Sequence, residues 1–292
     1  MLVKSKKKRK GGNIKNLKSY GFNTSKQFYT VAEIGINHGG DEDRAKKLID
    51  SAVRAGADSV KFQTYLTEKR VPNDSPIFHI LKQCELPFEA FEKLKNHANA
   101  QNIEFFSTPF DDESVQYLQE IGVNLFKVAS FDVVNHKLLS QIAKTKKTVI
   151  MSVGMANLAE INEAYSILKS KTDKIAILHC ISAYPTNESD ANLTVIGALK
   201  KEFDCVIGQS DHTNDIQVPL YAAVAGAQVL EKHFCIDEKM DCVDAPVSIT
   251  EAQMKKMVEE IRRIEEIFGE GDISLTEAEE GTAQFRRFSD QL

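Results

Sequence analysis

Short apolar runs rich in β-branched and aromatic residues recur along the chain from about residue 28 onward. The segments between them repeat their apolar residues with the helical period, which predicts amphipathic helices. Strands that alternate with helices in this way are typical of βα units, whose strands lie parallel in one sheet. The runs predict eight strands, at residues 29–36, 59–64, 103–108, 125–130, 148–153, 174–180, 205–210 and 228–234.

Eight strands favour a closed barrel over an open doubly wound sheet, which usually has five or six strands. The chain has 292 residues, and the part after a basic tail approaches the roughly 250 residues of a (β/α)8 TIM barrel. We therefore expect an α/β protein in which residues 1–27 are a short basic N-terminal extension and residues 28–288 are one TIM-barrel domain. The helical pattern is clearest at residues 44–55, 88–99, 112–121, 158–168, 219–225 and 251–268.

The predicted helix at residues 251–268 carries its apolar residues on one side, at helical spacing. Such a stripe is expected to pack against the barrel rather than to bind a cofactor. The residues that we expect in the core are Met254, Met257, Val258, Ile261, Ile264, Ile267 and Phe268.

Charge is distributed unevenly along the chain. The net charge is −5, but residues 1–30 hold nine Lys and Arg and no acid, which leaves 28 Lys and Arg against 42 Asp and Glu, or −14, in the remainder. An acidic body argues against a nucleic-acid-binding surface on the folded part. We expect the tail to be a solvated arm, the alternative being a localisation or polyanion-binding segment.

Cysteine usage and hydropathy predict a cytoplasmic protein. The five cysteines are odd in number, contain no Cys-x-x-Cys pair and lie mostly in apolar runs, which fits a reducing compartment. No run of about 18 apolar residues is present to span a membrane. The basic N-terminus is not followed by the apolar region of a secretory signal.

The predicted strands end in unusually polar residues, at the edge where TIM barrels place their chemistry. Glu33, Lys61, Lys127 and Glu231 lie inside apolar runs, where a charge is costly unless it is paired or binds a ligand. Two lysines together with nearby hydroxyl groups suit a phosphate or carboxylate, and no P-loop is present for that purpose. The alternative is a Lys–Glu network that only ties the barrel together. The hydroxyl residues are Thr108, Ser130, Ser152, Ser182 and Ser210.

Two histidines, His212 and His233, follow adjacent predicted strands, so their rings can reach one point. Two imidazoles with oxygen and water ligands suit Mn, Fe, Co or Zn, and such a metal can polarise a carbonyl group. The alternative is a pair of structural histidines. The further oxygen ligands or supporting anchors would come from Glu33, Glu231, Asp211 or Asp244, with His38 and His179 as additional supporting residues.

The strand-end motifs, in this order, resemble those of the sialic acid synthase family, which makes N-acetylneuraminate, legionaminate and pseudaminate. The resemblance runs from about residue 28 to residue 287. It implies a TIM barrel that condenses phosphoenolpyruvate with an open-chain N-acyl amino sugar, or its phosphate, to give a nine-carbon 2-keto-3-deoxy acid and phosphate. The motifs are AEIGINH at 32–38, KFQT at 61–64, STPF at 107–110, KVAS at 127–130, SVGM at 152–155, HCISAYPT at 179–186, GQSDHT at 208–213 and EKHF at 231–234.

The resemblance also implies roles for individual residues. The metal, for which we expect Mn²⁺ or Mg²⁺, would be bound by His212 and His233, and proton transfer would fall to Glu33. The sugar contacts would be Gln63, Tyr184, Glu231 and Asp244. The phosphoenolpyruvate contacts would be Lys61, Thr108, Lys127, Ser130, Ser152 and Ser210, with Ser182 at a position that is Asn or Ser in the family.

The chain departs from the family pattern in two places. Family members continue into a small antifreeze-like C-terminal domain that contacts the sugar across a dimer, whereas this sequence ends near the expected linker, at residues 286–288. The segment at 241–248 keeps Asp244 but has Ala245 where a histidine is frequent. A homodimer is expected from the family.

Two other functions compete with the synthase prediction. One is a metal-dependent or Schiff-base pyruvate aldolase, in which Lys127 or Lys61 attacks a carbonyl. The other is a non-catalytic barrel that serves as a subunit of another enzyme.

Overall fold

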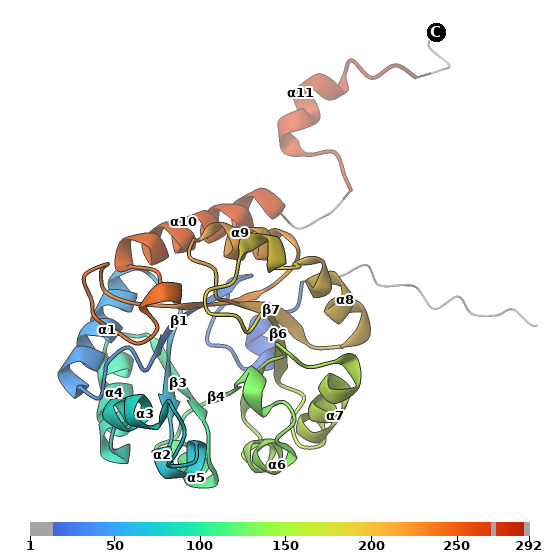
Figure 1. Ribbon diagram of the computed structural model, residues 1–292. Coiled ribbons are helices and arrows are strands. Elements are labelled where there is room, and N and C mark those ends of the chain that lie inside the picture. The colour runs from blue at the N-terminus through green and yellow to red at the C-terminus, as the bar shows by residue number, and fades with distance from the viewer. Residues whose placement is uncertain (1–13, 270–272, 289–292) are drawn as a thin grey trace, which may run out of the picture.

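Eight parallel strands close into one barrel in the computed structural model, which describes residues 14–269 and 273–288 (Figure 1). Each strand pairs with its neighbours in chain order, and β8 closes on β1. The predicted (β/α)8 TIM barrel is confirmed, and no strand end differs from its predicted position by more than two residues. The strands are β1 (Tyr29–Gly35), β2 (Ser59–Thr64), β3 (Glu104–Pro109), β4 (Leu125–Val128), β5 (Thr148–Ser152), β6 (Ile175–Cys180), β7 (Val206–Asp211) and β8 (Val229–His233).

Helices surround the barrel and cover the outer faces of its strands (Figure 1). The six predicted helices are present, and several begin at side-chain caps, such as Asp41 before α1 and Thr250 before α10. The sequence did not predict α2, α3, α6, α8 and α11. The helices are α1 (Glu42–Arg54), α2 (Thr67–Arg70), α3 (Phe78–Cys84), α4 (Phe88–Ala100), α5 (Asp112–Glu120), α6 (His136–Lys144), α7 (Leu158–Lys169), α8 (Thr194–Glu202), α9 (Gln217–Val224), α10 (Glu251–Phe268) and α11 (Glu280–Ala283).

Helix α10 packs against the barrel through only part of its predicted apolar stripe. Met254, Met257, Val258 and Ile261 are buried and Ile264 is partly buried. The prediction was wrong for the last two residues, because Ile267 is 71% exposed and Phe268 is 42% exposed. An 18-residue helix is about 27 Å long. The last turn of α10 extends past the edge of the barrel, which leaves its apolar residues exposed.

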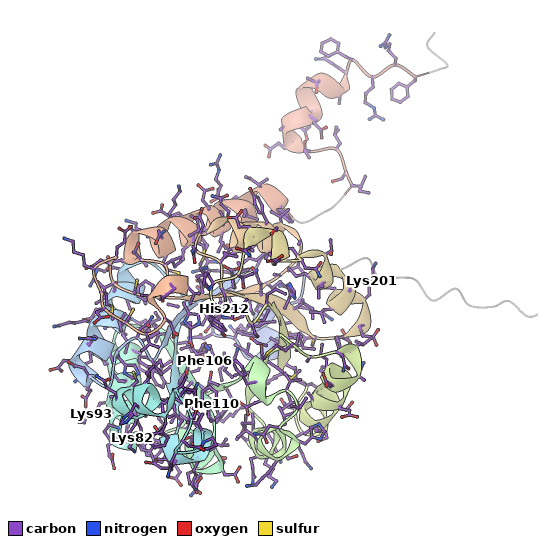
Figure 2. All side chains as sticks on the ribbon, viewed as in Figure 1. Lys82, Lys93, Phe106, Phe110, Lys201 and His212 are labelled. Carbon is purple, nitrogen blue, oxygen red and sulfur yellow. The ribbon has the colours of Figure 1, made fainter. Side chains whose placement is uncertain are left out.

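Side chains inside the barrel change from apolar to charged about halfway along the strands. Successive strand residues point to opposite faces, so alternate positions line the interior. In β1 these positions are Tyr29, Val31 and then Glu33. Residues near the N-terminal ends of the strands form an apolar interior cluster that includes Phe106, Leu125 and Ile150. The charged layer therefore lies above an apolar floor, and it opens toward the C-terminal ends of the strands. Figure 2 shows Phe106 and His212 near the barrel axis, while Lys82, Lys93 and Lys201 lie at the outer rim.

The segment before β1 closes the floor of the barrel. Leu17 and Phe22 are each 1% exposed and pack into the interior cluster. The Thr148 hydroxyl donates to the Tyr20 carbonyl over 2.9 Å, which ties the segment to β5. The expectation of a solvated arm was therefore wrong for residues 14–27, whereas the basic run at 1–13 lies outside the described residues.

Close packing inside the barrel requires a glycine in β7. A Cβ atom at Gly208 would lie 2.3 Å from the Val229 carbonyl oxygen and 2.5 Å from a Leu178 methyl group. Neither contact is possible for a real side chain. Gly208 therefore lets β8 and the Leu178 side chain approach β7 closely.

Beyond α10, the side chains of residues 273–288 are exposed apart from the half-buried Ala283. Figure 1 shows α11 apart from the barrel. The limits of 28–288 for the synthase domain remain a prediction. Across the described residues, none of the helices combines the length and apolar character needed to cross a lipid bilayer.

We predict that Phe22→Ala lowers the free energy of unfolding by about 3–5 kcal/mol, because it leaves a cavity in the barrel floor. Denaturant unfolding measures the change. Phe285→Ala is the matched control, since Phe285 is 74% exposed and its truncation should change stability by no more than about 0.5 kcal/mol. Equal unfolding midpoints for the two variants would show that the segment does not stabilise the barrel.

Candidate active site

A cavity of about 380 Å³ opens at the C-terminal ends of the strands. Thirteen of the fourteen residues to which the family resemblance gives a role line it, and Ser182 is the exception. Ser182 is partly buried beside the lining residue Cys180, with its Oγ 3.9 Å from Cys180 Sγ. The predicted residues in the cavity wall are Glu33, Lys61, Gln63, Thr108, Lys127, Ser130, Ser152, Tyr184, Ser210, His212, Glu231, His233 and Asp244.

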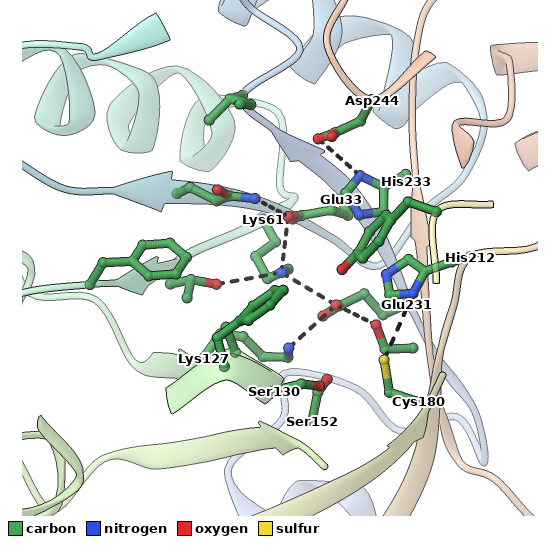
Figure 3. A pocket seen from close by; sticks show the side chains of 18 of the residues that line it. Glu33, Lys61, Lys127, Ser130, Ser152, Cys180, His212, Glu231, His233 and Asp244 are labelled. Atoms are coloured by element: carbon green, nitrogen blue, oxygen red, sulfur yellow. Dashed lines mark hydrogen bonds and ion pairs between the residues drawn. The ribbon is translucent and has the colours of Figure 1, made fainter. Parts of the chain in front are cut away.

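Two lysines and two glutamates form a buried network across the cavity floor (Figure 3). Lys61 Nζ lies 3.1 Å from Glu33 Oε1 and 3.3 Å from Glu231 Oε1, and Lys127 Nζ lies 3.4 Å from the same Glu231 oxygen. Ser210 donates to that oxygen over 3.0 Å. Glu231 Oε1 is therefore the acceptor shared by both lysines and by the Ser210 hydroxyl.

The network leaves several buried polar atoms without partners. Glu33 Oε2, Glu231 Oε2 and the Ser152 hydroxyl are buried and have no hydrogen-bond partner within the described part of the chain. A network that served only to tie the barrel together would be expected to satisfy these atoms, because each unpaired polar group costs stability. The arrangement therefore favours a polar ligand in the cavity.

Burial and pairing move the pKa values of the two glutamates in opposite directions. Burial alone would raise the pKa of Glu231, but Lys127 and Lys61 outweigh it and lower this pKa to about 2. The pKa of Glu33 is raised, because burial outweighs the attraction of Lys61. Glu231 is thus a permanent anion at neutral pH, while Glu33 is the carboxylate that is more able to hold a proton.

The side of the cavity formed by β2–β5 is rich in hydroxyl groups. Lys61 donates to Thr108 over 3.4 Å, and the Gly154 backbone N–H donates to Ser130 Oγ over 3.0 Å. A Cβ atom at Gly154 would lie 2.4 Å from Ser182 Oγ and 3.0 Å from Ser130 Oγ, so a larger residue would have to displace these hydroxyls. Burial lowers the pKa of Lys127 despite the nearby Glu231. Cations and donors on this side form a surface suited to an oxyanion.

The two histidines face each other on the opposite side. Their ring centroids are 5.4 Å apart, and the Tyr184 ring packs 4.1 Å from that of His212. His212 Nδ1 lies 2.8 Å from the Ile181 carbonyl oxygen, so this nitrogen carries the proton and donates. Burial, with some repulsion from His233, lowers the pKa of His212 to about 4. His212 is therefore neutral at physiological pH, with Nε2 available as a ligand.

Asp244 supports the second histidine. His233 Nδ1 lies 3.3 Å from Asp244 Oδ2, which is within ion-pair distance. The angles at this contact are not those of a hydrogen bond. Burial opposes protonation of His233, but Asp244 outweighs it and raises the pKa of this imidazole. A carboxylate behind the imidazole is the usual support of a metal-binding histidine.

Two imidazoles with backbone and carboxylate supports fit a divalent cation. No group of three or more His, Cys, Asp or Glu residues is arranged to bind a metal within residues 14–269 and 273–288. The protein would thus supply two ligands, and substrate or water would supply the others, which leaves open positions of the kind that catalytic metals use.

Three residues suggested from the sequence lie outside the cavity lining. Asp211 pairs with Lys232 over 2.6 Å and accepts from the Thr213 hydroxyl over 2.7 Å, so it does not face the histidines as a metal ligand. His38 Nδ1 accepts from the Gly40 backbone N–H, and His179 Nε2 donates to the Ala191 carbonyl. These local contacts explain Asp211 and His179, whereas the buried Nε2 of His38 has no hydrogen-bond partner among the described residues.

Sequence reasoning missed part of the cavity wall. Arg70 lies in α2, a four-residue helix that gave no periodic signal. Phe110 and Cys180 stood within quoted motifs but received no role, and the apolar residues at the rim gave no sign of exposure to a cavity. The missed lining residues are Ile36, Arg70, Ile77, Phe110, Ala129, Phe131 and Cys180.

Comparisons with known proteins agree with the resemblance seen in the motifs. The model of the NeuB family matches residues 48–273. The N,N'-diacetyllegionaminic acid synthase of Campylobacter jejuni is 39% identical over 84% of this chain and 79% of its own length. The N-acetylneuraminate-9-phosphate synthase of Mus musculus is 32% identical, over 82% of this chain and 71% of its own.

A solved structure shows the same fold. The N-acetylneuraminic acid synthetase of Leptospira borgpetersenii, in complex with citrate, superimposes with a TM-score of 0.87 at 38% identity. The match covers 91% of this chain and 93% of that one. Sequence and structure together confirm the predicted resemblance, and the chain belongs to the NeuB family of sialic acid synthases.

Proposed function

We propose that this protein condenses phosphoenolpyruvate with the open-chain aldehyde of an N-acyl amino sugar, giving a nine-carbon 2-keto-3-deoxy sugar acid and phosphate. The observation that carries the proposal is the cavity itself. It joins a cationic, hydroxyl-rich side to a pair of imidazoles, and it leaves buried oxygen atoms unpaired between them. The names of the relatives, which are synthases of legionaminic acid, pseudaminic acid and N-acetylneuraminate 9-phosphate, support it.

Phosphoenolpyruvate would bind on the β2–β5 side. Lys61 and Lys127 supply positive charge, and the buried Ser152 hydroxyl has no protein partner within the described ranges. Charge-assisted hydrogen bonds from these groups would bind the phosphate and carboxylate and stabilise the charge that develops as phosphate leaves. The residues proposed for this role are Lys61, Thr108, Lys127, Ser130 and Ser152 on that side, together with Ser210 of β7 and with Ser182, which lies outside the cavity lining.

The sugar would bind on the opposite side, where His212 and His233 would hold a divalent cation, Mn²⁺ or Mg²⁺. Such an ion, when bound, polarises the sugar aldehyde as a Lewis acid. Asp244 keeps the His233 ring in place over 3.3 Å. Tyr184 packs against the His212 ring, so its hydroxyl can orient the sugar near the same point. The proposed sugar contacts are Gln63, Tyr184, Glu231 and Asp244.

Glu33 is placed to move the proton of the attacking water. Its Oε1 is held by Lys61 and by the Gln63 amide over 3.2 Å, which leaves the buried Oε2 without a protein partner within the described ranges. As C3 of phosphoenolpyruvate attacks the aldehyde, positive charge develops at C2. The aldehyde oxygen takes a proton from solvent and becomes a hydroxyl group, and water adds to C2 while Glu33 Oε2 takes one of its protons. The tetrahedral intermediate then loses its hydroxyl proton and breaks the C2–O bond to phosphate, which leaves a ketone at C2 and releases inorganic phosphate.

The assembly and location of the protein are further parts of the proposal. The family resemblance favours a homodimer. The cysteines are reduced in the structure and four of the five are buried, which is consistent with a cytoplasmic protein.

A Schiff-base aldolase is the second candidate, because burial lowers the pKa of Lys127 and so favours its nucleophilic neutral amine. Its ion pair with Glu231, however, opposes loss of the proton. A non-catalytic barrel is disfavoured by the buried atoms of Glu33, Glu231 and Ser152 that have no partner among the described residues. Each such atom lowers stability, and a protein that bound no ligand there would have no function to offset the loss.

We predict that the protein with Mn²⁺ releases one phosphate per phosphoenolpyruvate consumed when an N-acyl amino sugar is present. The sugars to compare are N-acetylmannosamine, its 6-phosphate and the diacetamido-trideoxy hexoses, with phosphate measured by a colorimetric assay. EDTA should abolish the release and added Mn²⁺ should restore it. Consumption of free pyruvate, with borohydride trapping at Lys127, would instead establish the aldolase.

We predict that Glu33→Gln lowers kcat by about 10²–10⁴-fold, as expected for loss of a general base. The ionised carboxylate is the active form, so wild-type activity should fall as the pH drops through the pKa of Glu33, which is raised above the usual value of a glutamate. Glu33→Gln should abolish this acidic limb of the pH–rate profile. Glu113→Gln, at a surface residue paired with Lys69, is the control. An unchanged acidic limb in Glu33→Gln would exclude Glu33 as the base.

A further inference from the structure

Arg70 is a cation in the cavity wall that none of the roles above uses. It differs from Lys61 and Lys127, both of which lie within ion-pair distance of a glutamate. Within residues 14–269 and 273–288, Arg70 forms no ion pair, and its buried Nη1 has no hydrogen-bond partner. The acids whose field reaches it are Asp132, Asp244 and Glu33.

The guanidinium group is fixed between two aromatic rings. Its central carbon lies 3.7 Å from the centroid of Phe110 and 4.6 Å from that of Tyr65. The two rings meet edge to face, with centroids 6.3 Å apart. Stacking of this kind restrains the planar guanidinium without satisfying its N–H groups, which remain available to an acceptor.

The short helix that carries Arg70 is itself anchored. The backbone N–H of Thr67 donates to Glu85 over 2.7 Å, and the backbone N–H of Leu66 donates to Asp111 over 2.9 Å. These contacts tie α2 to the end of α3 and to the end of β3. Arg70 is therefore placed by the folded barrel before any ligand binds, which lowers the entropic cost of recognition.

An unpaired, largely buried cation carries a desolvation cost that a bound anion would offset. Burial lowers the pKa of Arg70 through this cost, in spite of the three acids nearby. A guanidinium presents parallel N–H groups that match the two oxygens of a carboxylate or phosphate. An apolar rim that includes the exposed Phe131 and Ile77 flanks the cavity.

We propose that Arg70 binds an oxyanion of a substrate, a carboxylate or phosphate group, at the mouth of the cavity, and so helps to determine which substrates the enzyme accepts. This inference rests on the proposed synthase function. Two sources offer the same chemistry, namely phosphoenolpyruvate and a phosphate group on the amino sugar. Arg70 then acts in binding and not in proton transfer.

The test compares Arg70→Met and Arg70→Lys with Lys69→Met, a neighbouring surface control in which Lys69 pairs with Glu113. KM and kcat are measured for phosphoenolpyruvate, N-acetylmannosamine and N-acetylmannosamine 6-phosphate. Arg70→Met should raise one KM by about 10–100-fold, the usual effect of losing hydrogen bonds to a charged group. Arg70→Lys should raise this KM less, because lysine keeps the positive charge but lacks the two parallel N–H groups of the guanidinium.

A rise in the KM for phosphoenolpyruvate identifies that substrate as the source, and a rise confined to the 6-phosphate identifies the sugar. An unchanged KM for every substrate in Arg70→Met, relative to Lys69→Met, overturns the inference, as does a fall in kcat alone. Thermal unfolding shows whether Arg70→Met is folded, and Arg70→Lys provides the comparison if it is not.

Calorimetric titration with phosphoenolpyruvate and with inorganic phosphate separates this inference from the proposed function. If the wild type binds these anions but releases no phosphate, the synthase proposal fails. Weaker binding in Arg70→Met would still support the anion site. If the wild type turns over and neither KM nor anion affinity depends on Arg70, only the inference fails.

Discussion

The alternation of side chains along eight parallel strands forces charged residues into the interior of this barrel. Glu33, Lys61, Lys127 and Glu231 occupy inward positions at the level where the apolar floor ends. Removing each charge from water costs several kcal/mol. Mutual pairing offsets only part of that cost, because Glu33 Oε2 and Glu231 Oε2 have no hydrogen-bond partner in the part of the chain that the structure describes. The rest of the site follows from this arrangement.

The floor beneath the network determines how strongly these charges act. Leu17 and Phe22 seal the barrel from below, and the interior cluster that they join is apolar throughout. In such surroundings electrostatic interactions are stronger than in water. The lowered pKa of Glu231 and the raised pKa of Glu33, two carboxylates that share Lys61, show that the site gives similar groups different protonation behaviour. A reaction that must bind an anion and also move a proton needs both kinds of group.

The strands and the cavity residues could be predicted because both depend on local pattern. Apolar runs located every strand. Charged residues inside such runs, such as Lys61 and Glu231, marked inward positions near the C-terminal ends of the strands, where TIM barrels place their chemistry. What could not be predicted depends on contacts distant in sequence. Leu17 and Phe22 are isolated apolar residues among Lys and Asn, and only the shape of the barrel floor accounts for their burial. The place of Arg70 in the cavity wall depends on its contacts with the rings of Tyr65 and Phe110. Ile267 keeps the helical spacing of the apolar stripe, but it is exposed because α10 extends past the barrel there.

The central claim is that the buried charges exist to bind substrate and not to hold the barrel together. The most direct measurement is the thermal midpoint and the phosphoenolpyruvate affinity of one variant, Lys127→Met with Glu231→Gln, which neutralises a buried pair with side chains of similar size. Replacing such a pair is often neutral or stabilising. The account therefore predicts an unchanged or higher midpoint, together with a loss of at least about tenfold in affinity. A markedly lower midpoint with unchanged affinity would contradict it.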